Sequence, residues 1–118
     1  MPVRSLTSRV LKWPDAAAVG QAARCWAARM AQEHAEVPRI GYFGSYARGD
    51  WGVGSDVDLI VILSHAEGPR ERRGVGWSRS GLPVPADVLF YTEDEWQALP
   101  QQGRFYKTLL QEAVWVYP

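Results

Sequence analysis

The sequence has only one cysteine, two histidines and no long apolar run. Because Cys25 is alone among the 118 residues, no intramolecular disulfide can form, which is usual in a reducing compartment. No apolar segment approaches the roughly 20 residues that a membrane-spanning helix needs. The N-terminal residues also lack the apolar stretch of a signal peptide. We therefore expect a cytoplasmic protein with no membrane partner.

The chain has no excess of either charge, because 13 acidic residues balance 13 Lys and Arg residues. Strong non-specific binding to nucleic acid depends on positive charge and is therefore not expected. Hydrophobic residues make up 47% of the sequence and charged residues 22%, which is typical of a folded rather than a disordered chain. The length suits one domain, which we place at residues 1–118.

The pattern of apolar residues predicts a mixed α/β fold, with a single mixed sheet and flanking helices. Helical spacing predicts a helix from Pro14 to about Glu33, in which Cys25 would be a small buried or half-buried filler. A helix from Pro69 to Trp77 is a weaker expectation, because two glycines within it disfavour helix. The remaining expected elements are strands at 8–13, 40–43, 59–63, 85–91 and 114–117 and helices at 92–99 and 103–112.

Two aspartates precede the most apolar of these strands. Asp56 and Asp58 are two residues apart, so on a strand their side chains project from the same face. Their negative charges repel each other, and a divalent cation is the usual compensation. Carboxylate oxygens favour Mg²⁺ or Mn²⁺ over zinc, and the two histidines lie in different segments. The pair alone is a weak signal, because most such pairs lie in solvated loops.

Chain connectivity predicts that a third aspartate lies beside this pair. The connection between strands 40–43 and 59–63 is short and suits an antiparallel pair. The segment from Leu63 to Pro85 is long enough for the crossover that parallel strands require. Asp87, at the start of the next strand, would then lie near Asp56 and Asp58. It would act as a general base or as a ligand of the catalytic ion.

A turn of small residues completes the predicted site. Gly44 and Ser45 follow strand 40–43, and glycine allows close approach of the backbone to a phosphate. Carboxylates, metal ions and a phosphate-binding turn together indicate phosphoryl or nucleotidyl transfer. The sequence contains no Walker A motif, no G-x-G-x-x-G motif between a strand and a helix, and no G-x-S-x-G motif.

The segment Gly44-Ser45, ten further residues and Asp56-Val57-Asp58 resembles the signature G-S-x(10)-D-x-D of the minimal nucleotidyltransferases. These belong to the DNA polymerase beta nucleotidyltransferase superfamily. The resemblance implies a polymerase-beta-like nucleotidyltransferase core, two Mg²⁺ ions (or Mn²⁺) and a nucleoside triphosphate, usually ATP. It implies that Gly44 and Ser45 hold the β- and γ-phosphates. It also implies that Asp56 and Asp58 bind both metals and that Asp87 completes the catalytic and metal-binding set.

Three other features have two readings each. Arg48 would either help to bind the triphosphate or have a local role, in which it caps the backbone or pairs with Asp50. The arginine-rich segment 70–79 would either contact a ligand or be a solvated crossover, and the solvated crossover is favoured. Trp51 is the tryptophan best placed to stack on a base or to meet a partner, although a packing role is more common.

The resemblance also implies an antitoxin that transfers AMP to a tyrosine of a small helical HEPN-type toxin. Relatives that modify small hydroxyl compounds such as aminoglycosides usually carry an additional helical domain, which we do not expect here. We therefore expect another chain to supply the acceptor, and a homo-oligomer is left open. The alternatives are a non-catalytic antitoxin that occludes its partner and an enzyme that modifies a small molecule.

Overall fold

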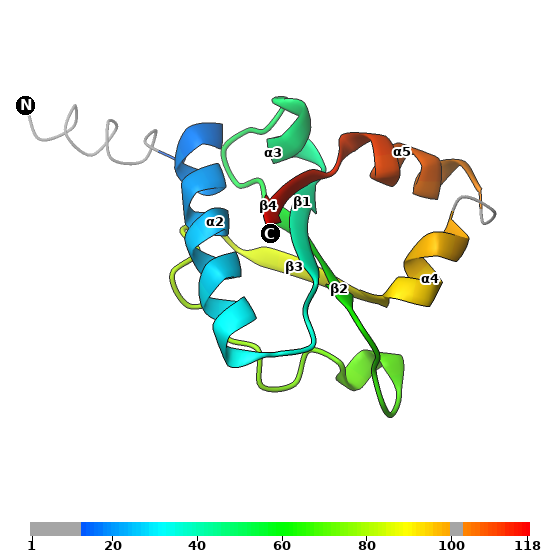
Figure 1. Ribbon diagram of the computed structural model, residues 1–118. Coiled ribbons are helices and arrows are strands. Elements are labelled where there is room, and N and C mark those ends of the chain that lie inside the picture. Colours follow the sequence, from blue (N-terminus) through cyan, green and yellow to red (C-terminus); the bar gives the residue numbers. More distant parts are fainter. Residues whose placement is uncertain (1–12, 100–102) are drawn as a thin grey trace, which may run out of the picture.

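A computed structural model describes residues 13–99 and 103–118 of the chain (Figure 1). Of the predicted strand at 8–13, only Trp13 lies within the described residues. The elements are α2 (Ala16–Glu33), β1 (Arg39–Phe43), α3 (Ser45–Arg48), β2 (Val57–Leu63), the 3-10 helix η1 (Arg70–Arg72), β3 (Ala86–Thr92), α4 (Glu93–Ala98), α5 (Arg104–Glu112) and β4 (Val114–Tyr117).

The four strands form one mixed sheet in the order β3-β2-β1-β4. Strand β1 is antiparallel to both β2 and β4, whereas β2 and β3 are parallel and joined by the crossover 64–85. The predicted pairing of the first three strands is therefore confirmed, as is the mixed α/β fold class. Both faces of β2 are buried, which explains its nearly continuous run of aliphatic residues.

Helices cover both faces of the sheet (Figure 1). On one face, α2 packs against the odd-numbered residues of β2, with Trp26 and Met30 fully buried. On the other face, Leu99 at the end of α4 and Leu109 on α5 belong to one buried cluster with Ile60, Ile62 and Tyr91 of the sheet. Asp58 is two residues before Ile60, so its side chain projects on the α5 side of the sheet.

Local signals fix the helix ends. The Asp15 carboxylate accepts a hydrogen bond from the amide of Ala18 at 2.8 Å and begins α2. Thr92 and Glu95 form the predicted capping box at the start of α4. Among the described residues, no helix is long and apolar enough to cross a membrane.

Two local predictions are wrong. Cys25 is exposed rather than buried, because it lies beside the apolar stripe of α2 and points away from the sheet. The helix expected from Pro69 to Trp77 is reduced to η1. Gly76, within the expected helix, has a positive φ of 88°, which a regular helix does not allow.

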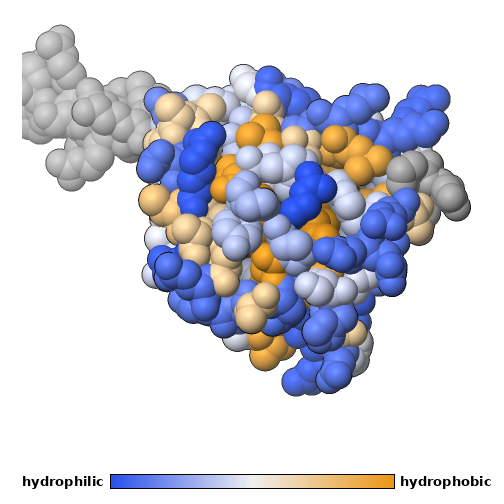
Figure 2. All heavy atoms as spheres, viewed as in Figure 1, coloured by the Kyte–Doolittle hydropathy of each residue, from blue (hydrophilic) through white to orange (hydrophobic). Residues whose placement is uncertain are grey.

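The segment 70–79 is mostly exposed, as expected for a solvated crossover, and Arg73 is an exception. The side chain of Arg73 is only 9% exposed and contacts both carboxylate oxygens of Glu95, at 2.6 and 3.1 Å. It also donates to the carbonyl oxygen of Phe90 on β3 at 3.2 Å. On the face shown in Figure 2, hydrophobic residues are interspersed among hydrophilic ones, and the large hydrophobic residues exposed in the described chain are Val53 and Val75.

Candidate active site

Gly44 directly follows β1 and lies close to the start of β2. Its backbone has φ 80° and ψ −152°, a region that is essentially open only to glycine. A Cβ atom at this position would overlap with the carboxylate of Asp58. Gly44 is therefore needed twice, for the backbone turn and for the close approach of that carboxylate. Ser45 follows as the first residue of α3.

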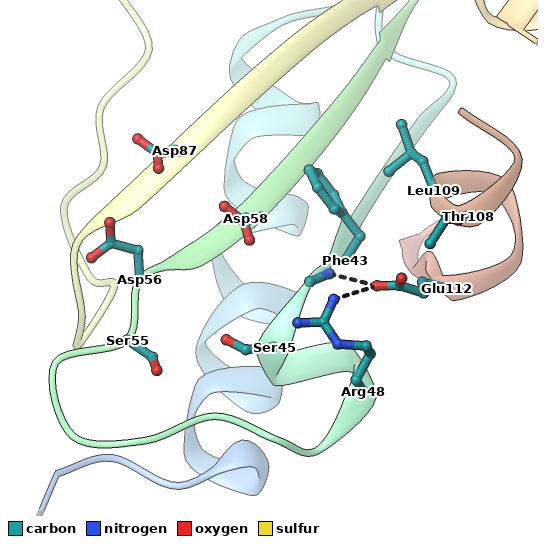
Figure 3. A pocket seen from close by; sticks show the side chains of 11 residues that line it. Phe43, Ser45, Arg48, Ser55, Asp56, Asp58, Asp87, Thr108, Leu109 and Glu112 are labelled. Carbon is teal, nitrogen blue, oxygen red and sulfur yellow. Dashed lines mark hydrogen bonds and ion pairs between the residues drawn. The ribbon is translucent and has the colours of Figure 1, made fainter. Parts of the chain in front are cut away.

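The parallel pairing of β2 and β3 places Asp58 directly opposite Asp87. Neighbouring strands lie about 4.8 Å apart, so these two carboxylates share one face of the sheet at close range. Asp56 precedes β2 by one residue and lies beside them in Figure 3. The juxtaposition of the three aspartates that connectivity predicted is thus present in the structure, while their individual roles remain predictions.

Burial is the main reason why the pKa of Asp58 lies above its ordinary value of 3.8. The negative charges of Asp87 and then Asp56 raise the pKa further, whereas the charge of Arg48 lowers it. Asp58 is half-buried, and both Asp56 and Asp87 are exposed. The site therefore carries negative charge that the described side chains do not neutralise.

A cavity of about 530 Å³ opens in front of the aspartates. This volume falls within the range of small-ligand sites. Its walls come from the β1–α3 turn, the starts of β2 and β3, and one face of α5 (Figure 3). The lining residues are Phe43, Gly44, Ser45, Arg48, Ser55, Asp56, Asp58, Asp87, Thr108, Leu109 and Glu112. All six residues that the sequence predicted for the site are therefore part of one cavity.

Glu112 is the residue of this cavity that sequence reasoning missed most clearly. One of its carboxylate oxygens, Oε1, accepts hydrogen bonds from the amide of Gly44 at 3.2 Å and from Nη1 of Arg48 at 3.0 Å. Arg48 also contacts Asp50 through Nε at 3.0 Å, as one of its two expected readings proposed. The available signal was an acidic residue in the last turn of a helix, where the helix dipole disfavours negative charge.

Trp51, for which the sequence allowed two readings, has a packing contact, and Ser55 closes a loop. Trp51 stacks on Tyr46, with ring centroids 5.5 Å apart and an interplanar angle of 9°. Tyr46 is buried and accepts a hydrogen bond from the indole of Trp13 at 2.8 Å. Ser55, which lines the cavity, accepts a hydrogen bond from the amide of Gly52 at 2.8 Å and closes the loop before Asp56.

The donor set fits a hard divalent cation in charge and in chemistry, because it consists of carboxylates with an uncompensated negative charge. Within residues 13–99 and 103–118, however, no group of three or more His, Cys, Asp or Glu side chains is arranged to hold a metal ion without further ligands. Mg²⁺ is commonly held by one or two carboxylates together with substrate phosphates. The aspartates therefore fit an ion that arrives with a phosphorylated substrate better than a permanently caged one.

Residues 25–116 match the family model described as "Nucleotidyltransferase domain", and the chain belongs to this family. Such enzymes use a nucleoside triphosphate and a divalent cation. The fold is similar to the crystal structure of "a putative nucleotidyltransferase from Sulfolobus solfataricus", with a TM-score of 0.59 and 20% sequence identity over 82% of this chain and 78% of the other. No curated protein shows significant sequence similarity.

Proposed function

We propose that the protein transfers AMP from ATP to a hydroxyl group of a partner protein. The observation that supports this most strongly is the position of Asp58 opposite Asp87, beside the turn at Gly44 and in one open cavity. Family membership supports nucleotidyl transfer as the reaction class. The choice of AMP, of a protein acceptor and of an antitoxin role rests on the G-S-x(10)-D-x-D resemblance.

In this proposal, different residues of the cavity bind the phosphates and the divalent cations. Gly44, Ser45 and Arg48 bind the β- and γ-phosphates, because they offer a backbone amide, a hydroxyl and a guanidinium group. Asp56 and Asp58 hold the divalent cations. When bound, these cations neutralise the triphosphate and lower the pKa of the attacking hydroxyl.

Asp87 is the candidate general base, because it is exposed and is the aspartate left over when Asp56 and Asp58 hold the cations. In the proposed reaction, the acceptor oxygen forms a bond to the α-phosphorus, and the bond to the bridging oxygen breaks. Pyrophosphate leaves, and the proton of the acceptor hydroxyl moves to Asp87. An exposed carboxylate is well placed for this step, because it can return the proton to solvent.

The size of the cavity bears on the acceptor. About 530 Å³ suits one ligand of small-molecule size, and we assign that space to the nucleotide. The acceptor then approaches from the open side as part of another molecule. A small helical HEPN-type toxin is the acceptor that the resemblance suggests.

The test uses ATP labelled at the α-phosphate, Mg²⁺ and the helical protein encoded by the neighbouring gene. Label on that protein, and none when the ATP is labelled at the γ-phosphate, is expected from transfer of AMP. Asp87→Asn should abolish the transfer, whereas Glu67→Gln, an exposed carboxylate outside the cavity, should not.

Two other results separate the alternatives. A stable complex without label transfer would favour a non-catalytic antitoxin and contradict the proposal. Label on a small hydroxyl compound such as an aminoglycoside, with none on the protein, would keep the nucleotidyl transfer and overturn the protein acceptor.

A further inference from the structure

The cavity already holds an anionic oxygen of its own. Oε1 of Glu112 lies 3.2 Å from the amide nitrogen of Gly44 and 3.0 Å from Nη1 of Arg48, and it accepts a hydrogen bond from each. The two donors come from the β1–α3 turn and from the last residue of α3, and the acceptor comes from the last residue of α5, more than sixty positions away in the sequence. The dashed lines in Figure 3 show that the two bonds converge on one oxygen atom.

A backbone amide and a guanidinium group directed at one negatively charged oxygen form the arrangement that recognises a phosphate. These are also donors that the proposed function assigns to the triphosphate. The side chain of Glu112 is only 17% exposed, so its carboxylate lies inside the cavity. Its charge also contributes, after burial and the two other aspartates, to the raised pKa of Asp58.

We propose that Glu112 is an internal competitor for the triphosphate, whose terminal phosphate displaces the Glu112 carboxylate from Gly44 and Arg48. The inference rests on the proposed function, since it assumes that a nucleoside triphosphate enters this cavity. Glu112 then lowers the affinity for the triphosphate, because binding must first break the two hydrogen bonds that Glu112 accepts in the free protein.

The geometry leaves Arg48 in position for the exchange. Its Nε atom is bound by Asp50 at 3.0 Å, so the guanidinium keeps one partner when Nη1 is released from Glu112. The amide of Gly44 is fixed by the backbone and needs no rearrangement. Displacement therefore requires movement of the Glu112 side chain rather than refolding of the turn.

Two matched substitutions separate competition from a general charge effect. Glu112→Gln and Asp50→Asn each remove one negative charge beside Arg48, but only Glu112 also occupies the Gly44 amide. A neutral amide oxygen holds a guanidinium less strongly than a carboxylate does. We expect Glu112→Gln to bind ATP with Mg²⁺ at least about fivefold more tightly than the unchanged protein, and Asp50→Asn to remain within about twofold.

The experiment is calorimetric titration of the full chain and both variants with ATP and Mg²⁺, with inorganic tripolyphosphate and Mg²⁺, and with adenosine. Circular dichroism verifies that each variant is folded. Tighter binding of ATP and tripolyphosphate by Glu112→Gln alone, with adenosine unaffected, is the expected result. Glu112→Ala, which removes the carboxylate entirely, should show the same direction.

Three results would overturn the inference. Equal gains in Glu112→Gln and Asp50→Asn would indicate a general charge effect. Unchanged or weaker binding in both Glu112 variants would show that Glu112 positions the turn and does not compete. If neither the unchanged protein nor a folded variant binds ATP or tripolyphosphate, the proposed function is refuted, and the inference that rests on it is refuted with it.

Discussion

Replacing Asp58 with asparagine should make the ligand-free protein more stable, although we expect the same change to abolish nucleotidyl transfer. Burial and the charges of Asp87 and Asp56 raise the pKa of Asp58, so its ionised form is unfavourable in the folded state. Asparagine has nearly the same shape and removes the charge. The expected gain in stability indicates that the aspartates are arranged to bind a cation, and that this arrangement destabilises the ligand-free protein.

The expected size of the gain follows from the register. Asp58 and Asp87 lie opposite each other on adjacent strands, about 4.8 Å apart. At about 5 Å, two like charges repel by about 0.8 kcal/mol in water and about 3 kcal/mol at an effective dielectric constant of 20. Because Asp87 is exposed, the lower end applies, and we expect about 1 kcal/mol. This corresponds to an increase in Tm of roughly 3–6 °C.

The assay is thermal and urea unfolding of the unchanged protein, Asp58→Asn and the control Glu67→Gln, without divalent cations. A raised pKa means that the folded state binds more protons than the unfolded state, so the penalty is present at pH 7. It disappears as the pH falls through the folded pKa and below the ordinary value of 3.8. The advantage of Asp58→Asn should therefore shrink at pH 3. A variant that is less stable at pH 7, or equally favoured at both pH values, would refute the reasoning.

Three further changes test the site and its surroundings by urea unfolding, and the first of them also by titration with ATP. Gly44→Ala should cost about 1–3 kcal/mol and abolish ATP binding, because the backbone there is strained for any other residue and the new methyl group displaces Asp58; unchanged binding would show that the turn does not hold the nucleotide. Glu95→Gln should cost about 1 kcal/mol at pH 7. The Arg73 contact, as the largest cause, lowers the pKa of Glu95 to about 2, so the stabilisation is complete above the ordinary value of 4.5 and lost as the pH falls through 2; a cost that persists below that pH would contradict this. Thr92→Ala should cost about 1 kcal/mol through loss of the capping box, and no cost would indicate that packing alone holds α4.

The sheet could be predicted from the sequence because its signals are local. The aliphatic run 59–63 has the composition of a strand buried on both faces, and the lengths of the two connections determine which neighbour is antiparallel and which is parallel. The position of Asp87 beside Asp58 followed from this connectivity alone. The turn at Gly44 was likewise visible as small residues after an apolar strand.

Long-range side-chain contacts could not be predicted in the same way. The hydrogen bonds of Glu112 depend on where α5 crosses the sheet, and no motif near residue 112 encodes that path. The bond from Arg73 to Glu95 joins the crossover to α4 and converts part of an expected solvated segment into a packed one. The exposure of Cys25, by contrast, could have been predicted, because helical spacing places this residue beside the apolar stripe of α2.

We expect a nucleotide and a divalent cation to bind at the aspartate end of β2 and β3. The most direct measurement is NMR line broadening of the backbone amides on titration with ATP and paramagnetic Mn²⁺. The amides of Gly44, Asp58 and Asp87 should broaden first, whereas those of Leu63 and Thr92, at the opposite ends of the same strands, should remain sharp. Broadening centred at that opposite end, or none with ATP and Mn²⁺ in excess, would show that the aspartates do not form the binding site.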